Sequence, residues 1–178
     1  CYIGHNIVSV PSPSPLTKDM QGTQLESVAS LKPDRKRLTI TNSFGMPSTG
    51  PEQWMPEVRE TEEWMKEHGK KTVTSVVGTP REGWGIKELA DDYALCTEYA
   101  KEAGADVIEM NFSCPNVHGK EGTIYKNPET AGLICETVRK RVPNVKLLIK
   151  VGWAKKEEYR ELLSAVHSSI DGVTAINT

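Results

Sequence analysis

The chain has 178 residues, of which 37% are hydrophobic and 26% are charged, and its formal net charge is -2. This composition is typical of a water-soluble domain with one buried core, and the length is too short for two full domains. The near-neutral charge argues against a nucleic-acid-binding protein, and no apolar run reaches the roughly 18 residues that span a bilayer.

The first third of the chain predicts two short strands and one helix. Residues 1–10 alternate between apolar and polar side chains as a strand does, and the alternate prolines that follow impose an extended segment. Residues 11–36 are polar, and we interpret them as an excursion within a single domain that covers 1–178. Residues 37–41 predict a second strand, and 51–68 predict an amphipathic helix with Pro51 in its first turn.

The rest of the chain alternates regularly between strands and helices. Strands are predicted at 71–78, 106–111, 144–151 and 172–177, and helices at 86–103, 128–142 and 155–168. This alternation is typical of βαβ units with a parallel sheet. Because such units connect with one hand, the sheet is either open and doubly wound or closed into a barrel.

Polar residues at the strand ends favour the barrel. Candidate ligand-binding residues close the predicted strands at Asn42, Ser75, Asn111, Lys150 and Asn177. A (β/α) barrel builds its active site from the carboxyl ends of several strands, and no Gly-x-Gly-x-x-Gly is present to support a dinucleotide-binding sheet. Counting residues 1–10 as the first strand, we expect about five barrel strands, an incomplete portion of an α/β (β/α)8 TIM barrel.

The cysteines indicate free thiols rather than a metal centre. Cys1, Cys96, Cys114 and Cys135 lie far apart, with no spacing typical of a zinc site or a disulfide framework. We therefore expect no metal. Together with the lack of a secretory signal at the start, this usage predicts a cytoplasmic protein.

Residues 111–116, Asn-Phe-Ser-Cys-Pro-Asn, carry the strongest chemical signal. The carboxamides of Asn111 and Asn116 suit a planar ring that bears carbonyl and N–H groups. The thiol of Cys114 becomes a base or a nucleophile once it is deprotonated. The residues alone leave open a polar loop with one buried cysteine, or a hydrolase that pairs Cys114 with His118.

Residues 109–116, Glu-Met-Asn-Phe-Ser-Cys-Pro-Asn, closely resemble the signature of the dihydroorotate dehydrogenases and the related dihydropyrimidine dehydrogenases. Three further segments resemble that family in the same order. Residues 42–47 are similar to the family's substrate loop. Lys150 is similar to its flavin-contacting lysine, and residues 175–178 are similar to a strand end that reads Asn-Ser or Asn-Thr in the family.

The resemblance implies an FMN-dependent oxidoreductase of pyrimidine biosynthesis that acts as a homodimer, without a membrane or nucleic-acid partner. It implies that Cys114, a cysteine as in the soluble class, removes a proton from C5 of a dihydropyrimidine while hydride passes from C6 to the flavin. The residues that it assigns to the substrate are Asn42, Ser48, Asn111, Asn116, Asn177 and Thr178. Those that it assigns to FMN are Ser75, Asn111 and Lys150.

The sequence departs from the family pattern at two places. Ser48 stands where the family usually has asparagine, and the family's lysine near the end of the second barrel strand has only His5 and Asn6 as counterparts. Both changes remove side chains that would bind orotate. We therefore keep three alternatives: a related substrate, a non-catalytic relative with the same scaffold, or an inert portion of the enzyme that lacks the loops for the FMN phosphate.

Overall fold

The structure of the chain is a computed structural model, and it describes residues 7–11, 38–42, 49–113 and 120–175. The chain divides into two compact units, residues 1–48 with Thr178 and residues 49–177. We describe each unit by itself. The prediction of one domain over 1–178 stays a prediction.

The smaller unit contains a two-stranded antiparallel sheet. Strand β1 (Ile7–Pro11) pairs with β2 (Leu38–Asn42), with Ile7 opposite Asn42 and Pro11 opposite Leu38. Both strands were predicted, but the assignment of the first one to the parallel barrel sheet was wrong. Alternation of apolar and polar residues marks a strand without specifying its partner, and an antiparallel partner can follow a connection of any length. Residues 12–37 of the predicted excursion lie outside the described residues.

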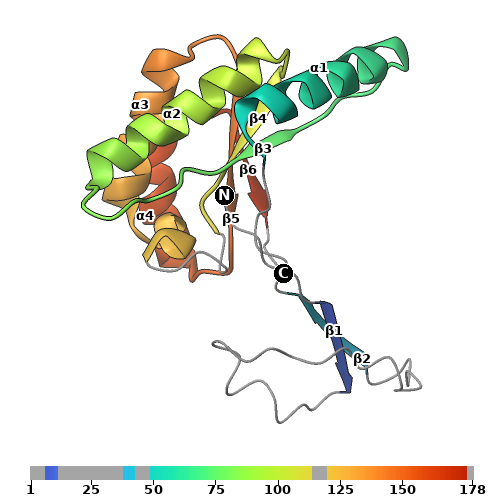
Figure 1. Cartoon of the computed structure of the whole chain (residues 1–178). Coiled ribbons are helices and arrows are strands. Elements are labelled where there is room, and N and C mark those ends of the chain that lie inside the picture. The colour runs from blue at the N-terminus through green and yellow to red at the C-terminus, as the bar shows by residue number, and fades with distance from the viewer. Residues whose placement is uncertain (1–6, 12–37, 43–48, 114–119, 176–178) are drawn as a thin grey trace. The chain divides into compact units, whose positions relative to one another are not determined.

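The larger unit is built on a four-stranded parallel sheet whose strands follow one another in chain order (Figure 1). The strands are β3 (Thr74–Val76), β4 (Val107–Asn111), β5 (Lys146–Val151) and β6 (Gly172–Ala175). Helices α2 (Ile86–Glu102), α3 (Pro128–Arg141) and α4 (Lys156–Val166) connect them in turn. A further helix, α1 (Pro51–Glu67), precedes β3.

The helices lie on one face of this sheet. Each crossover adds the next strand on the same side, and because crossovers are right-handed, every connecting helix falls on the same face. Accordingly α2 packs on α3, and α3 packs on α4 (Figure 1). A doubly wound sheet would carry helices on both faces. The structure thus confirms an α/β fold with the winding of a partial TIM barrel.

Local sequence signals set the helix ends close to where they were predicted. Pro128 opens α3, and the Asn127 side chain accepts a hydrogen bond from the Thr130 amide at 3.1 Å. The Glu88 carboxylate accepts a hydrogen bond from the Gly85 amide at 2.9 Å, which caps α2. Gly104 follows α2 with φ of 103°, a left-handed conformation that glycine adopts without strain.

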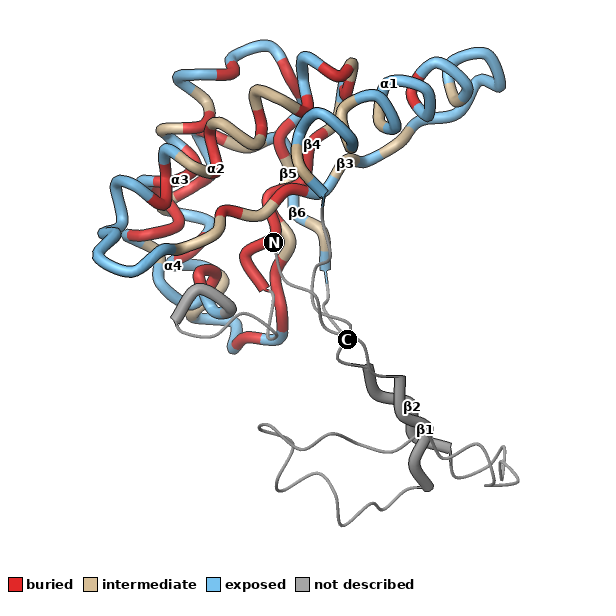
Figure 2. The backbone as a smooth tube through the Cα atoms, viewed as in Figure 1, coloured by how far each residue is buried: buried red, intermediate tan, exposed pale blue. Residues whose placement is uncertain are grey.

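The hydrophobic core lies between the sheet and its helices (Figure 2). Alternate residues of the central strands are fully buried, namely Ile108, Met110, Leu147, Ile149 and Val151. They meet buried helix residues that include Tyr93, Ile134, Val138, Leu162 and Val166. Each such large side chain stabilises the fold by about 1.5–3 kcal/mol on burial. The alternation leaves the other face of the strands free for polar residues.

The segment after β4 contains a short helix that was not among the predicted elements. Residues Lys120–Lys126 form a 3-10 helix, η2, in which Ile124 and Tyr125 are buried. The Tyr125 hydroxyl donates to the carbonyl of Trp153 at 3.1 Å. The apolar pair thus anchors η2 against the chain that follows β5. Residues 114–119, between β4 and η2, lie outside the described residues.

A charged cluster ties the amino-terminal ends of β5 and β6 together. The Asp171 carboxylate accepts hydrogen bonds from the Leu147 amide at 2.9 Å, from Arg139 at 2.6 Å and from Lys146 at 3.1 Å. The backbone hydrogen bond from Leu147, followed by the bonds from Arg139 and Lys146, lowers the pKa of Asp171 from 3.8 to about 2. Arg139 also donates to the carbonyls of Ser169 and Val145. In a (β/α) barrel this end of the strands serves stability rather than catalysis.

None of the helices within the described ranges is both long enough and apolar enough to cross a lipid bilayer.

Candidate active site

Polar side chains gather on the face of the parallel sheet that lies opposite the helices. Alternation along each strand places Glu109, Asn111 and Lys150 on this face, since Met110 and Ile149 point into the helix-covered core. The register puts Asn111 beside Lys150, and Lys150 beside Thr174. Three neighbouring strands therefore present a carboxamide, an ammonium and a hydroxyl in one row near their carboxyl ends.

Asn111 is buried and held at two of its atoms. Its backbone carbonyl accepts a hydrogen bond from the Tyr93 hydroxyl at 2.9 Å, and its side-chain oxygen accepts one from the Ser113 amide at 3.1 Å. The Tyr93 ring meets Phe112 edge-on, with centroids 5.6 Å apart. These contacts fix the end of β4 where the chain departs toward Cys114.

Lys150 is the half-buried cation of this row. Its side chain makes no hydrogen bond or ion pair within the part of the chain that the structure describes, whereas Lys146 on the same strand is bound to Asp171 at 3.1 Å. An ammonium without a protein partner is suited to an electron-rich or anionic ligand.

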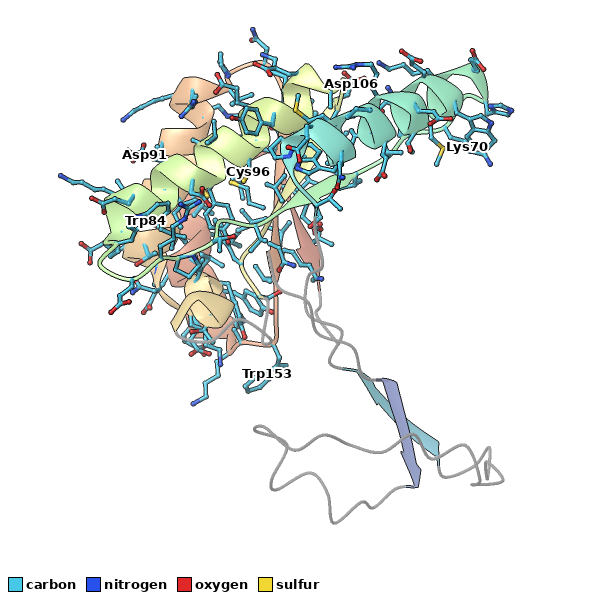
Figure 3. The ribbon with its side chains drawn as sticks, viewed as in Figure 1. Lys70, Trp84, Asp91, Cys96, Asp106 and Trp153 are labelled. Carbon is cyan, nitrogen blue, oxygen red and sulfur yellow. The ribbon has the colours of Figure 1, made fainter. Side chains whose placement is uncertain are left out.

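Two tyrosines hold the turn that follows Lys150. The Tyr159 hydroxyl donates to the Gly152 carbonyl at 2.5 Å, and the Tyr125 hydroxyl donates to the Trp153 carbonyl at 3.1 Å. A Cβ atom at Gly152 would lie 2.8 Å from the Tyr125 hydroxyl, so this close approach requires glycine. Trp153 itself is 68% exposed and projects outward beyond β5 (Figure 3). The turn after β5 is thereby anchored by its backbone carbonyls, next to the half-buried Lys150.

Two residues before Asn111 on β4, Glu109 forms a hydrogen-bonded pair with Ser75 of β3. They are register partners on β3 and β4, and the Ser75 hydroxyl donates to the Glu109 carboxylate at 2.9 Å. Glu109 is only 7% exposed. Sequence reasoning assigned Ser75 to the cofactor but gave Glu109 no role. The signal was available, because Glu109 and Asn111 are two residues apart on a strand and must share a face.

The structure thus brings together three of the predicted site residues, Ser75, Asn111 and Lys150, on one face of one sheet. Asn42 is the last residue of β2 and belongs to the smaller unit. The other predicted residues lie outside the described residues, namely Ser48, Cys114, Asn116, Asn177 and Thr178, together with His118. All of these assignments stay predictions.

The described cysteines are poor nucleophiles. Burial raises the pKa of the Cys96 thiol to about 11 and that of Cys135 to about 12. Both therefore stay protonated near neutral pH, and a thiolate is the reactive form. No group of three or more His, Cys, Asp or Glu side chains within the described ranges is arranged to hold a metal ion.

A surface hollow of about 320 Å³ also lies between the first turns of α2 and α3, where Ile86, Glu129 and Leu133 line it. Its lining comes from the helices and contains none of the predicted site residues. We therefore place the candidate site on the sheet.

The donor set of the sheet face fits a flavin. An unpaired ammonium can oppose negative charge on a reduced ring, and a fixed carboxamide can meet ring carbonyl and N–H groups. Asn111 and Lys150 supply these two groups as direct register partners.

Comparisons with known proteins show which family this chain resembles. A profile described as dihydroorotate dehydrogenase matches residues 16–178. A "Dihydroorotate dehydrogenase" of Dictyostelium discoideum is 32% identical over 166 residues, which cover 91% of this chain and 44% of that protein. The "Dihydroorotate dehydrogenase B (NAD(+)), catalytic subunit" of Methanocaldococcus jannaschii is 27% identical over 77% of this chain and 41% of its own length.

The Escherichia coli K12 protein "NAD-dependent dihydropyrimidine dehydrogenase subunit PreA" is 32% identical over 61% of this chain and 25% of its own length. The chain therefore spans less than half of the length of these relatives.

Proposed function

Because this chain belongs to the dihydroorotate dehydrogenase family, we propose that it forms part of the active site of an FMN-dependent oxidoreductase that oxidises a dihydropyrimidine. The observation that carries the proposal is the register of Asn111 with Lys150, whose ammonium has no partner among the described residues. The reaction removes a proton from C5 and a hydride from C6 of the substrate ring. Bound FMN supplies the hydride acceptor.

The residues of the sheet face bind the cofactor. Lys150 would supply a positive charge to the bound flavin, and electrostatic stabilisation of that kind is a major contribution to catalysis. Asn111 presents its carboxamide from a strand end fixed by Tyr93 and Ser113. Ser75 offers a hydroxyl from the neighbouring strand.

Cys114 acts as the base in this proposal. Its thiolate takes the proton from C5 and becomes a thiol as the C5–C6 double bond forms. β4 ends at Asn111, three residues before Cys114, and its end is held by the bond from the Tyr93 hydroxyl to the Asn111 carbonyl and by the bond from the Phe112 amide to the Lys150 carbonyl. Asn42, Ser48, Asn116, Asn177 and Thr178 hydrogen-bond the substrate ring and its substituents.

The substrate is dihydroorotate or a related dihydropyrimidine, in pyrimidine metabolism. Ser48 and the lack of a counterpart to the family's lysine near the end of the second barrel strand favour a compound related to dihydroorotate. The similarity to a protein named as a dihydropyrimidine dehydrogenase subunit also supports a dihydropyrimidine substrate. We place the whole protein in the cytoplasm as a homodimer that binds this small molecule, without a nucleic-acid or membrane partner.

The test is the visible spectrum of the protein that contains this chain. We expect bound FMN with an absorbance maximum at about 450 nm, and we expect this absorbance to bleach when dihydroorotate or dihydrouracil is added without oxygen. Replacing Cys114 with alanine (Cys114→Ala) removes a general base and should slow bleaching by about 100-fold or more, with FMN still bound.

Two other outcomes would contradict the proposal. A yellow protein that no dihydropyrimidine bleaches would indicate a non-catalytic or differently specific relative. A colourless protein in which Cys114 forms an acyl adduct would indicate a cysteine hydrolase.

A further inference from the structure

Glu109 is a buried carboxylate on the ligand-facing side of the sheet to which the proposed reaction gives no part. It is 7% exposed, and its hydrogen-bond partner is the Ser75 hydroxyl at 2.9 Å. A buried carboxylate is costly unless it is paired or hydrogen-bonded, and one neutral donor compensates only part of that cost. A positive charge within reach on the same face would compensate the remainder.

Among the described residues, Lys150 lies on the same face of the sheet as Glu109 and within reach of its carboxylate. Glu109 pairs in register with Leu148, and Lys150 lies two residues further along β5 on the same face. Strand spacing then separates the two Cα atoms by about 8 Å, a distance that their long side chains can bridge directly or through one ligand. The other lysine of this face, Lys146, is bound to Asp171 at the opposite end of the strand.

We propose that Glu109, held by Ser75, is the counter-charge of Lys150 and that the pair sets the reduction potential of the bound flavin. The proposal rests on the proposed function, because it requires the flavin beside Lys150. Lys150 favours the added negative charge of the reduced ring, and Glu109 opposes it. Glu109 is thus a positioning residue that keeps the net charge of the sheet face near neutral.

The decisive variant is Glu109→Gln, which removes the charge and keeps an oxygen to accept the Ser75 hydrogen bond. We expect the ratio of affinities for reduced over oxidised FMN to rise about tenfold, the order expected for loss of one partly screened charge nearby. For a two-electron couple this corresponds to a midpoint potential about 30 mV higher. The measurement is a redox titration of the FMN-loaded protein that contains this chain.

A double variant tests whether the two charges act on the flavin in opposite directions. Lys150→Met should lower the potential, and Glu109→Gln combined with Lys150→Met should return it close to the wild-type value. As a matched control, Glu98→Gln neutralises a carboxylate of α2 that is bound to Arg141 at 2.6 Å, and it should leave the potential unchanged. The urea-unfolding midpoint of Glu109→Gln should stay near that of the wild type.

The failures are distinguishable. If the wild-type protein binds no FMN, the proposed function and this inference both fall. If it binds FMN and is bleached by a dihydropyrimidine, but Glu109→Gln leaves the potential unchanged or lowers it, only the charge pair is refuted. If Glu109→Gln lowers stability without moving the potential, Glu109 has a structural role instead.

Discussion

At the scale of single residues, Tyr93 shows how the core reaches the site. Its ring is buried among core residues, and its hydroxyl donates to the carbonyl of Asn111 at the end of β4. The ring also occupies the space that a side chain at Gly78 would need, since a Cβ atom there would lie 2.5 Å from it. One residue of α2 therefore constrains both the end of β4 and the segment that follows β3.

Replacing Tyr93 with phenylalanine should lower the free energy of unfolding by about 1–3 kcal/mol, because a buried carbonyl loses its hydrogen bond. Urea denaturation measures the change. The matched control is Tyr99→Phe on the same helix, whose ring lies 6.4 Å from Trp54 and whose hydroxyl has no hydrogen bond within the described segments. That variant should change the free energy by about 0.5 kcal/mol or less. Equal effects would refute the role of the Tyr93 hydroxyl.

The described cysteines allow a second prediction at this scale. With their pKa values raised to about 11 and about 12, Cys96 and Cys135 are thiolates to about one part in a thousand or less at pH 8. Iodoacetamide should therefore label both slowly in the native protein and quickly in urea. Mass spectrometry of the digested protein measures the labelled fractions. Rapid native labelling of Cys135 would show that α3 opens readily.

At the scale of elements, local signals and long-range pairing differ in how far the sequence predicts them. The four helices begin within one residue of their predicted starts, because Pro51, Pro128 and the capping side chains act on neighbouring backbone groups. Strand pairing depends on residues far apart in the chain. The sequence therefore predicted β1 as a strand and missed its antiparallel partner.

The same reasoning explains what could be predicted of the site. Asn111 and Lys150 close strands with clear apolar alternation, so their common face followed once the strands were parallel neighbours. The bond between Ser75 and Glu109 joins residues 34 positions apart, and it depends on the register of β3 with β4. No local pattern specifies that register.

The cluster around Asp171 belongs to this scale, because it joins β5, α3 and the turn before β6. A carboxyl whose pKa falls from 3.8 to about 2 on folding stabilises the fold above pH 4, and this contribution is lost as the pH falls toward 2. Asp171→Asn should therefore be less stable than the wild type at pH 6, and the difference should shrink between pH 4 and pH 2.

Urea denaturation at several pH values measures this difference, which we expect to be about 1–3 kcal/mol at pH 6 for loss of hydrogen bonds to a charged group. The control is Asp106→Asn, which removes an exposed ion pair with Lys71 at 3.6 Å and should cost less than about 1 kcal/mol. A difference for Asp171→Asn that stays constant across this pH range would contradict the assignment.

At the scale of the larger unit, the winding of the chain separates the residues that stabilise the fold from those that we propose to bind the ligand. Helices cover one face of the sheet and make the core, and we propose that the other face, which carries Asn111 and Lys150, binds the ligand. Along the strands, the ion-pair cluster of Asp171 lies at the amino ends, and the row of Asn111, Lys150 and Thr174 lies near the carboxyl ends. The stabilising ion pairs and the proposed binding residues thus lie at opposite ends of the strands.

This division bears on how readily the protein could acquire a new substrate. Changes in the connections after the strands leave the Asp171 cluster and the apolar layer intact, so they cost little folding free energy. Evolution, or a laboratory selection, can therefore vary ligand preference at one end while the scaffold at the other end stays the same.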